Sequence, residues 1–173
     1  YGKNYYDEPY QNGTSLSVGK FNKNSSSDWS VGLYKKLVAK LNHLPEPQNS
    51  AWYYIGIFPN TVIGLYPDSV IFYQDIPVGL KQTNQRGAVY RHKDENRLMR
   101  VARYLSGRID GLTAEEDLQL TKWVDEAPES SGFDGIILSD LEYGVHTFHE
   151  HLREILPILK EDLEPGMLRG TNR

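Results

Sequence analysis

The sequence contains no cysteine among its 173 residues. This absence excludes disulfide bonds, thiolate zinc sites, cysteine nucleophiles and cysteine-ligated iron–sulfur clusters within these residues. The chain also lacks any apolar run near the roughly 18 residues that a membrane span needs, and no signal-peptide pattern opens it. A net charge of −4 gives no reason to expect nucleic acid as a partner. We therefore expect a cytoplasmic protein that binds neither membranes nor nucleic acid.

The residues that are present are typical of one globular domain. Hydrophobic residues make up 39% of the chain and charged residues 24%, which favours a folded over a disordered protein. A chain of this length can bury one sizeable core, so we expect residues 1–173 to form a single domain. The chain begins at Tyr1 rather than at methionine, which a processed protein, an isolated domain or a fragment would each explain.

The first half of the chain contains one predicted helix and a series of predicted strands. The first 30 residues are predicted to be loops around a short strand at 15–20, because they are rich in Tyr, Asn, Ser and Gly. Leucine and valine recur at helical spacing in 33–44, which predicts an amphipathic helix. Aromatic and β-branched residues then predict three strands joined by short turns, at 52–58, 62–66 and 69–76, and alternating polar positions predict a more polar fourth strand at 81–91. Loops this short predict an antiparallel meander.

The last third is predicted to be helical. An apolar stripe predicts a helix that ends at Gly111, with members Leu98, Val101, Ala102, Leu105 and Ile109. Thr113 and Glu116 match a capping box that would open a second helix at about 114–127, and Ser139 and Glu142 would open a longer third one. Strands followed by helices predict an α+β domain, with helices on one face of a curved sheet.

The segment TAEEDLQLTKW, residues 113–123, contains a candidate ligand. The helix dipole explains Glu115, and the capping box explains Glu116. Asp117 has no such explanation, because aspartate is a poor helix former away from the cap and this one lies at the border of the apolar stripe. The spacing favours a hydrogen-bonded boundary residue over a ligand for Asp117, and both interpretations stay open.

Three histidines in the segment HTFHEH suggest a metal site, since imidazole suits Zn, Fe and Ni. On a helix, however, His151 lies roughly opposite His146, with His149 between them. A hydrogen-bonded, semi-buried His149 beside Phe148 is therefore the favoured interpretation, and a metal site here is a weaker alternative.

A group of arginines on the first predicted helix of the last third indicates a solvated helix face or a docking surface for an acidic protein. Its members are Arg97, Arg100, Arg103 and Arg108. No GxSxG, P-loop or HExxH motif occurs in the sequence.

The order of several short motifs resembles a known family. IFPN at 57–60 follows an apolar strand, EEDLQLTKWVDEAPESSGF occupies 115–133, and LSDLEYGVHTFHEHLREIL occupies 138–156. This series resembles the C-terminal half of the catalytic domain of Rieske non-haem iron oxygenases, the aromatic-ring-hydroxylating oxygenase alpha subunits. The resemblance spans roughly residues 50–160.

The resemblance implies a helix-grip (START-like) fold, in which a curved antiparallel sheet packs against a long C-terminal helix and encloses a cavity. In this family two histidines and one carboxylate hold a mononuclear Fe(II) and leave positions open for O₂ and substrate. The carboxylate of the family motif corresponds to Asp117. The resemblance assigns no other residue of this chain to catalysis.

Two departures from the family pattern matter. The two histidine ligands form an H-x4-H motif upstream of the sheet, whereas residues 1–50 contain only His43. The Rieske [2Fe–2S] cluster needs cysteines, so we expect it only in an N-terminal domain that these residues do not include. The chain is then either a piece of a longer alpha subunit or a relative without the redox apparatus.

The resemblance implies that these residues, as part of a longer chain, belong to an oxidoreductase. The enzyme would hydroxylate an organic, most often aromatic, substrate with O₂ at iron. A reductase or ferredoxin would supply electrons, and family members commonly form homotrimers. We expect the isolated 173 residues to be inactive. The alternative is a non-catalytic helix-grip module that binds a small apolar ligand, which explains the missing histidines and cysteines without truncation.

Overall fold

The structure is a computed structural model of the whole chain, and the residues it describes are 4–22, 28–133, 135, 137–139 and 142–160. The chain divides into two compact units, residues 1–137 and residues 138–173. The expectation of a single domain stays a prediction. No helix in the described part of the chain is long and apolar enough to cross a membrane.

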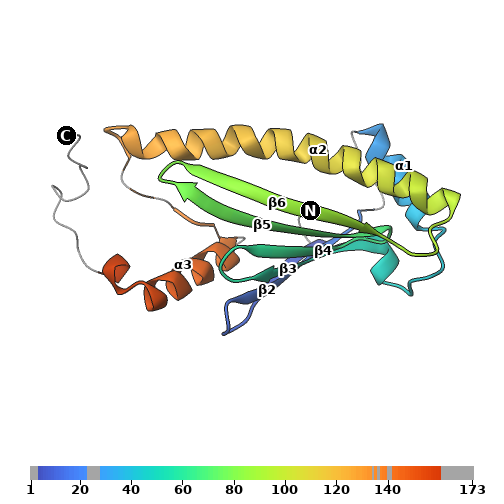
Figure 1. Cartoon of the computed structure of the whole chain (residues 1–173), viewed down its shortest axis with the longest axis horizontal. Coiled ribbons are helices and arrows are strands. Elements are labelled where there is room, and N and C mark those ends of the chain that lie inside the picture. The colour runs from blue at the N-terminus through green and yellow to red at the C-terminus, as the bar shows by residue number, and fades with distance from the viewer. Residues whose placement is uncertain (1–3, 23–27, 134, 136, 140–141, 161–173) are drawn as a thin grey trace. The chain divides into compact units, whose positions relative to one another are not determined.

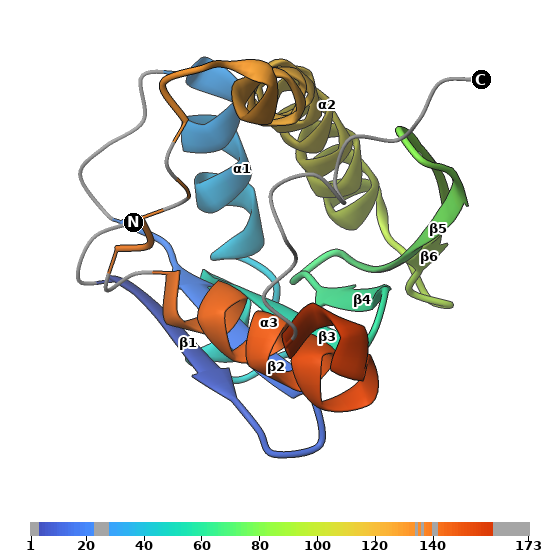
Figure 2. The same cartoon turned by 90° about the vertical axis from the view of Figure 1, so that its left-hand side faces the viewer.

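The first unit contains one six-stranded sheet in which each strand pairs antiparallel with the next along the chain (Figure 1). The predicted meander is confirmed. Figure 2 shows this sheet curving from β1 and β2 toward β5 and β6, with α1 and α2 on one side of it. The strands are β1 (Tyr5–Pro9), β2 (Thr14–Lys20), β3 (Ala51–Ile57), β4 (Thr61–Leu65), β5 (Ser69–Gly79) and β6 (Gln82–Arg91).

The edge strand β1 was not predicted from the sequence. Its residues YYDEP mix aromatic, acidic and proline side chains, so neither an apolar run nor a clean alternation marks them. Tertiary pairing with β2 supplies the strand instead, in a register that sets Tyr5 opposite Gly19 and Pro9 opposite Ser15. The side chains also meet, since the Ser17 hydroxyl donates to the Asp7 carboxylate at 2.7 Å.

Helix α1 (Trp29–Val38) begins and ends earlier than the predicted 33–44. It begins earlier because Asp28 caps it, with its carboxylate accepting the Ser30 backbone N–H at 2.6 Å. After Val38, the backbone N–H of Leu41 donates to the Val38 carbonyl at 2.9 Å, and the chain then turns away. A short 3₁₀ helix, η2 (Gln48–Ser50), leads into β3.

Helix α2 (Arg97–Glu126) is one continuous helix of 30 residues, so the predicted break at Gly111 is wrong. The described glycines with positive φ are Gly13 and Gly135, which means that Gly111 does not adopt the left-handed C-cap conformation. A single helical glycine costs only about 1 kcal/mol, which a long helix can absorb. The capping box predicted at Thr113 and Glu116 therefore has no helix start to cap.

Asn96 forms the cap of α2, since its side chain accepts the Met99 backbone N–H at 3.0 Å. The helix ends in a 3₁₀ turn, η3 (Ala127–Glu129), that contains Pro128. The predicted apolar stripe is confirmed at Ala102 and Leu105, which are buried, whereas Val101 is 41% exposed and Met99 is buried in its place.

The second unit contains α3 (Tyr143–Ile155) and a 3₁₀ helix, η5 (Pro157–Lys160). The predicted signature at Ser139 and Glu142 forms before this helix: both the N–H and the hydroxyl of Ser139 donate to the Glu142 carboxylate, at 2.7 and 2.8 Å. Helix α3 has 13 residues, so the long helix of the protein is α2.

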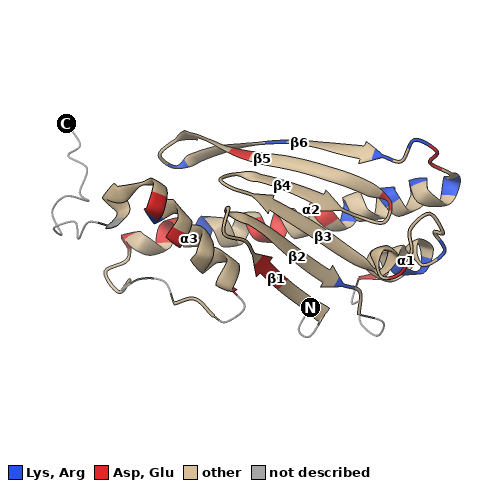
Figure 3. Ribbon diagram, turned by 90° about the horizontal axis from the view of Figure 1, so that it is seen from below, with Lys and Arg blue, Asp and Glu red and all other residues tan. Residues whose placement is uncertain are grey.

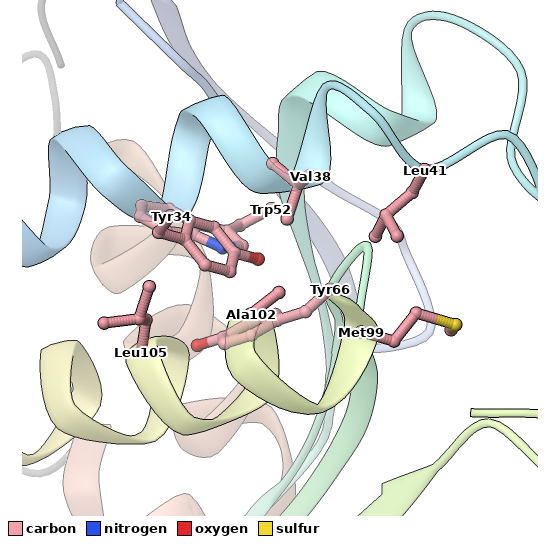
Figure 4. Close-up of a cluster of buried hydrophobic side chains, with 8 residues drawn as sticks. All are labelled: Tyr34, Val38, Leu41, Trp52, Tyr66, Met99, Ala102 and Leu105. Carbon is pink, nitrogen blue, oxygen red and sulfur yellow. The ribbon is translucent and has the colours of Figure 1, made fainter. Parts of the chain in front are cut away.

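The core of the first unit lies where α1 and α2 meet the sheet (Figure 4). Tyr34 stacks on Trp52 with ring centroids 5.8 Å apart, and Trp52 contacts Tyr66 at the same separation. The α+β class, with a curved antiparallel sheet and a long helix, is confirmed. The buried cluster comprises Tyr34, Val38, Leu41, Trp52, Tyr66, Met99, Ala102 and Leu105.

Candidate functional site

Asp117 lies in the second half of α2, where every residue from Gly111 to Glu126 is exposed. The predicted border position is therefore wrong for the described residues. Burial is the main cause that raises the pKa of Tyr73 on β5, and the negative charges of Asp75, Asp110 and, least of all, Asp117 raise it further. The charge of Asp117 thus has a minor effect on Tyr73.

Asp110 lies seven residues before Asp117, which places both on nearly the same side of α2. It is half-buried, and the Tyr66 hydroxyl donates to its carboxylate at 3.0 Å. The Tyr66 hydroxyl also lies 3.0 Å from the Tyr54 hydroxyl. Burial raises the pKa of Asp110 to about 6, and the charge of Asp68 adds to this while the bond from Tyr66 opposes it. Asp110 thus titrates near neutral pH.

Asp68, in the turn between β4 and β5, is 1% exposed and accepts three hydroxyl hydrogen bonds. The distances are 2.5 Å from Tyr34, 2.8 Å from Ser106 and 3.0 Å from Ser69. Burial and the neighbouring Asp68 carboxylate raise the pKa of Tyr34, so it remains a donor at all ordinary pH values. This carboxylate joins α1, α2 and the sheet.

The sequence did not predict a role for either the buried Asp68 or the half-buried Asp110. Asp68 was read as part of a turn, since the PD pair at 67–68 separates two strands. Asp110 carried a signal that could have been used, because it lies four residues after Ser106 and eight after Ala102, on the buried face of the helix. A carboxylate continuing a buried stripe indicates a hydrogen-bonded or functional group.

Three arginines of α2 form ion pairs or ring contacts with other parts of the chain, which goes beyond a purely solvated helix face. Arg103 donates from Nε to Glu95 at 2.6 Å, and Arg100 lies 3.6 Å from the same carboxylate. The hydrogen bond from Arg103 is the main cause that lowers the pKa of Glu95. Arg108 instead lies over the ring of Trp29, 5.4 Å from its centroid, and links α2 to α1.

A mononuclear iron centre of this family requires two histidines beside the carboxylate. Among the residues that the structure describes, no group of three His, Cys, Asp or Glu side chains is placed to hold a metal ion. His43 and His92 lie beside each other, with ring centroids 5.4 Å apart, and do not join Asp117 in such a group. The described residues therefore do not fit a complete iron centre, and Asp117 is one candidate ligand.

The histidines of HTFHEH all lie on α3, but each has a different neighbour. His146 stacks on Tyr143 with ring centroids 6.5 Å apart, and His149 meets Phe148 edge-on with ring centroids 6.1 Å apart. Nδ1 of His151 lies 3.4 Å from a carboxylate oxygen of Glu154. His149 lies beside Phe148 as predicted, but it is exposed, so the predicted semi-buried position is wrong. These histidines do not form a metal-binding group with the other described residues, so that alternative is not supported.

Comparison with known proteins agrees with this architecture. A family model described as the ring hydroxylating alpha subunit (catalytic domain) matches residues 8–158. The crystal structure of the quaternary ammonium Rieske monooxygenase CntA in complex with an inhibitor is similar, with a TM-score of 0.61 and 18% sequence identity. The similarity covers 87% of this chain and 38% of the CntA chain. No curated protein sequence matches significantly.

The curved sheet and long helix are thus the fold of a Rieske oxygenase catalytic domain. The family match extends over most of the sequence, and this chain belongs to the ring hydroxylating alpha subunit family, in its catalytic domain. It spans well under half the length of the CntA chain. The resemblance stated from the sequence motifs is confirmed.

Proposed function

We propose that this chain is the catalytic-domain portion of a Rieske-type oxygenase, which hydroxylates an organic substrate with O₂ at a mononuclear non-haem iron. The family match over residues 8–158 is the observation that carries the proposal. The fold shared with CntA supports it. The substrate class is aromatic by family resemblance, and a quaternary ammonium compound, as named for CntA, is the second candidate.

Asp117 is the proposed iron ligand of this chain. Its position on α2, near enough to β5 for its charge to reach Tyr73, is compatible with a ligand that completes a site from one side. The two histidine ligands would come from residues outside those the structure describes, in the H-x4-H motif that the family carries upstream of the sheet. Bound iron would supply O₂ activation, and the chain would supply the carboxylate and a wall of the substrate cavity.

The complete protein would need partners that these residues do not include. A Rieske [2Fe–2S] cluster in an N-terminal domain would pass electrons from a reductase or ferredoxin to the iron. Homotrimer formation is proposed because it is common in the family. We propose a cytoplasmic location and no membrane or nucleic-acid partner. The isolated chain should be inactive and should retain little iron.

The second candidate function is a non-catalytic helix-grip module that holds a small apolar ligand. The observation that favours it is the lack of any described group of three metal-ligating side chains. In this case the cavity of the fold would be used for binding alone, and Asp117 would be an ordinary exposed helix residue.

The gene upstream of the Tyr1 codon separates the two candidates. Codons for an H-x4-H motif and for a Rieske C-x-H and C-x-x-H pair there would support the oxygenase. A start codon close to Tyr1 would support the binding module. The corresponding assay is O₂ consumption by the complete protein with its reductase, with hydroxylated product measured by mass spectrometry; apolar ligand binding without turnover would contradict the oxygenase.

A further inference from the structure

A pocket of about 360 Å³ lies beside the end of β6 in the first unit. Its walls come from the segment after α1, from the turn between β4 and β5, and from residues 90–93. This volume lies within the range of small-molecule sites, about 300–1,000 Å³. No described metal-binding group contributes to it.

One part of the pocket wall is apolar. Leu44, Pro67, Val70 and Tyr90 all line it, and Val70 and Tyr90 are 38% and 58% exposed. A planar apolar group placed against Val70 and Tyr90 would remove their exposed surface from water, which favours binding, whereas Pro67 is already buried.

The other part of the wall carries positive charge and hydrogen-bond donors. Arg91 and Lys93 line it together with His43 and His92. The acid in the wall, Asp68, is 1% exposed, and both of its oxygens accept hydrogen bonds from neighbouring hydroxyls. Arg91 and Lys93 each form one long ion pair, at 3.9 Å, with Glu95 and Asp94 respectively, and Glu95 is bound more closely by Arg103 at 2.6 Å.

The cations of this wall belong to a segment with an excess of positive charge, which Glu95 and Asp94 neutralise only in part. Between residues 91 and 108 the chain has six Lys and Arg against two acids, although its net charge is −4. Figure 3 shows this basic region along the first half of α2 and the turn before it. The first turn of α2 contains no acid, and its dipole adds positive potential there. This excess of positive charge would attract an anion.

The hydrogen bonding of His92 favours an anion over a metal ion. The backbone N–H of Asp94 donates to His92 Nδ1 at 3.2 Å, so Nδ1 is the acceptor of the neutral ring and Nε2 carries the proton. A metal ion needs an imidazole nitrogen with a free lone pair, and in this tautomer neither nitrogen offers one. The Nε2–H group remains a donor, which suits an oxyanion.

We propose that this pocket binds a small anion in which a carboxylate or phosphate is attached to an apolar group. The oxyanion lies toward Arg91, His92 and Lys93, and the apolar group lies against Val70 and Tyr90. The site is separate from the proposed iron ligand Asp117, and its existence does not depend on oxygenase activity.

The test is isothermal titration calorimetry of the full chain with four probes. Benzoate and phenyl phosphate carry both groups, benzamide is the neutral counterpart of benzoate, and inorganic phosphate lacks the apolar group. We expect the first two to bind with a dissociation constant of about 1 mM, as suits ligands of this size. Benzamide and inorganic phosphate should bind at least about tenfold more weakly, because benzamide lacks the negative charge and inorganic phosphate lacks the apolar ring.

Charge-removing variants locate the binding. Arg91→Gln should weaken benzoate and phenyl phosphate binding about tenfold, and Lys93→Gln provides a second variant if the first unfolds. Arg97→Gln is the matched control, because it removes the same charge from the same region without lining the pocket. Each variant's thermal unfolding checks its fold.

Four outcomes would overturn the proposal: no binding of benzoate or phenyl phosphate, equal binding of benzamide, equal binding of inorganic phosphate, or equal losses in Arg97→Gln and the pocket variants. The last would mean that the general field of α2, rather than this pocket, attracts the anion.

Discussion

Replacing Tyr34 by Phe tests whether the buried carboxylate Asp68 holds the first unit together. The substitution removes the hydroxyl that donates to Asp68 at 2.5 Å and accepts from Trp52 Nε1 at 3.3 Å. The ring keeps its place in the core, so the change removes hydrogen bonds and little apolar contact. Hydrogen bonds to charged groups contribute about 1.5–3 kcal/mol, and a buried acceptor that loses a donor adds to the cost.

We therefore expect Tyr34→Phe to lower the free energy of unfolding by about 2–3 kcal/mol. For a chain of this size that corresponds to a fall in Tm of about 4–12 °C, measured by calorimetry or circular dichroism. The matched control is Tyr54→Phe, because the Tyr54 hydroxyl contacts the neutral Tyr66 hydroxyl at 3.0 Å. Loss of this hydrogen bond between two neutral hydroxyls should lower the free energy of unfolding by about 0.5–1.5 kcal/mol. An equal or smaller loss for Tyr34→Phe would refute the assigned role of Asp68.

Two further predictions concern α2. Gly111→Ala should raise stability by about 0.5–1 kcal/mol, since an added Cβ meets nothing within 4 Å and the backbone is helical; a loss in chemical denaturation would instead place a helix end there. Asp110→Asn should change the pH dependence of Tm. The folded-state pKa of about 6 exceeds the ordinary value of 3.8, so the stability from protonated Asp110 is present below about pH 4 and is lost as the pH rises through 6. The Asn variant should therefore be more stable than the natural chain at pH 7.5 and about equal at pH 4, whereas parallel curves would contradict the raised pKa.

The sheet could be predicted from the sequence because its strands are locally marked. Segments such as 52–58 and 69–76 are dense in aromatic and β-branched residues, and short turns separate them. The end of a helix was harder to predict, because the same residues occur in caps and inside long helices. Gly111 followed by Thr113 and Glu116 has the composition of a break, yet α2 continues through it. Nothing local distinguishes the two cases.

The candidate site was only partly visible in the sequence. Asp117 was singled out by its motif, but its spacing suggested a border position, and the structure leaves it exposed. Asp68 gave no signal, since its role depends on Tyr34 and Ser106, which lie 34 and 38 residues away in the chain. The anion pocket likewise depends on bringing His43 beside His92, which spacing alone does not reveal.

The central claim is that Asp117 ligates iron in the complete subunit, and iron content tests it most directly. Elemental analysis would compare mononuclear iron, corrected for the Rieske cluster, in the complete natural protein and in three variants: Asp117→Ala, Glu116→Ala and Asp110→Asn. Glu116 is the adjacent exposed carboxylate, and Asp110 is the carboxylate on the same side of α2. We expect loss of mononuclear iron and of turnover in Asp117→Ala alone, with the fold retained, because an exposed helical Asp→Ala change favours the helix. Full iron content and activity in Asp117→Ala would contradict the account.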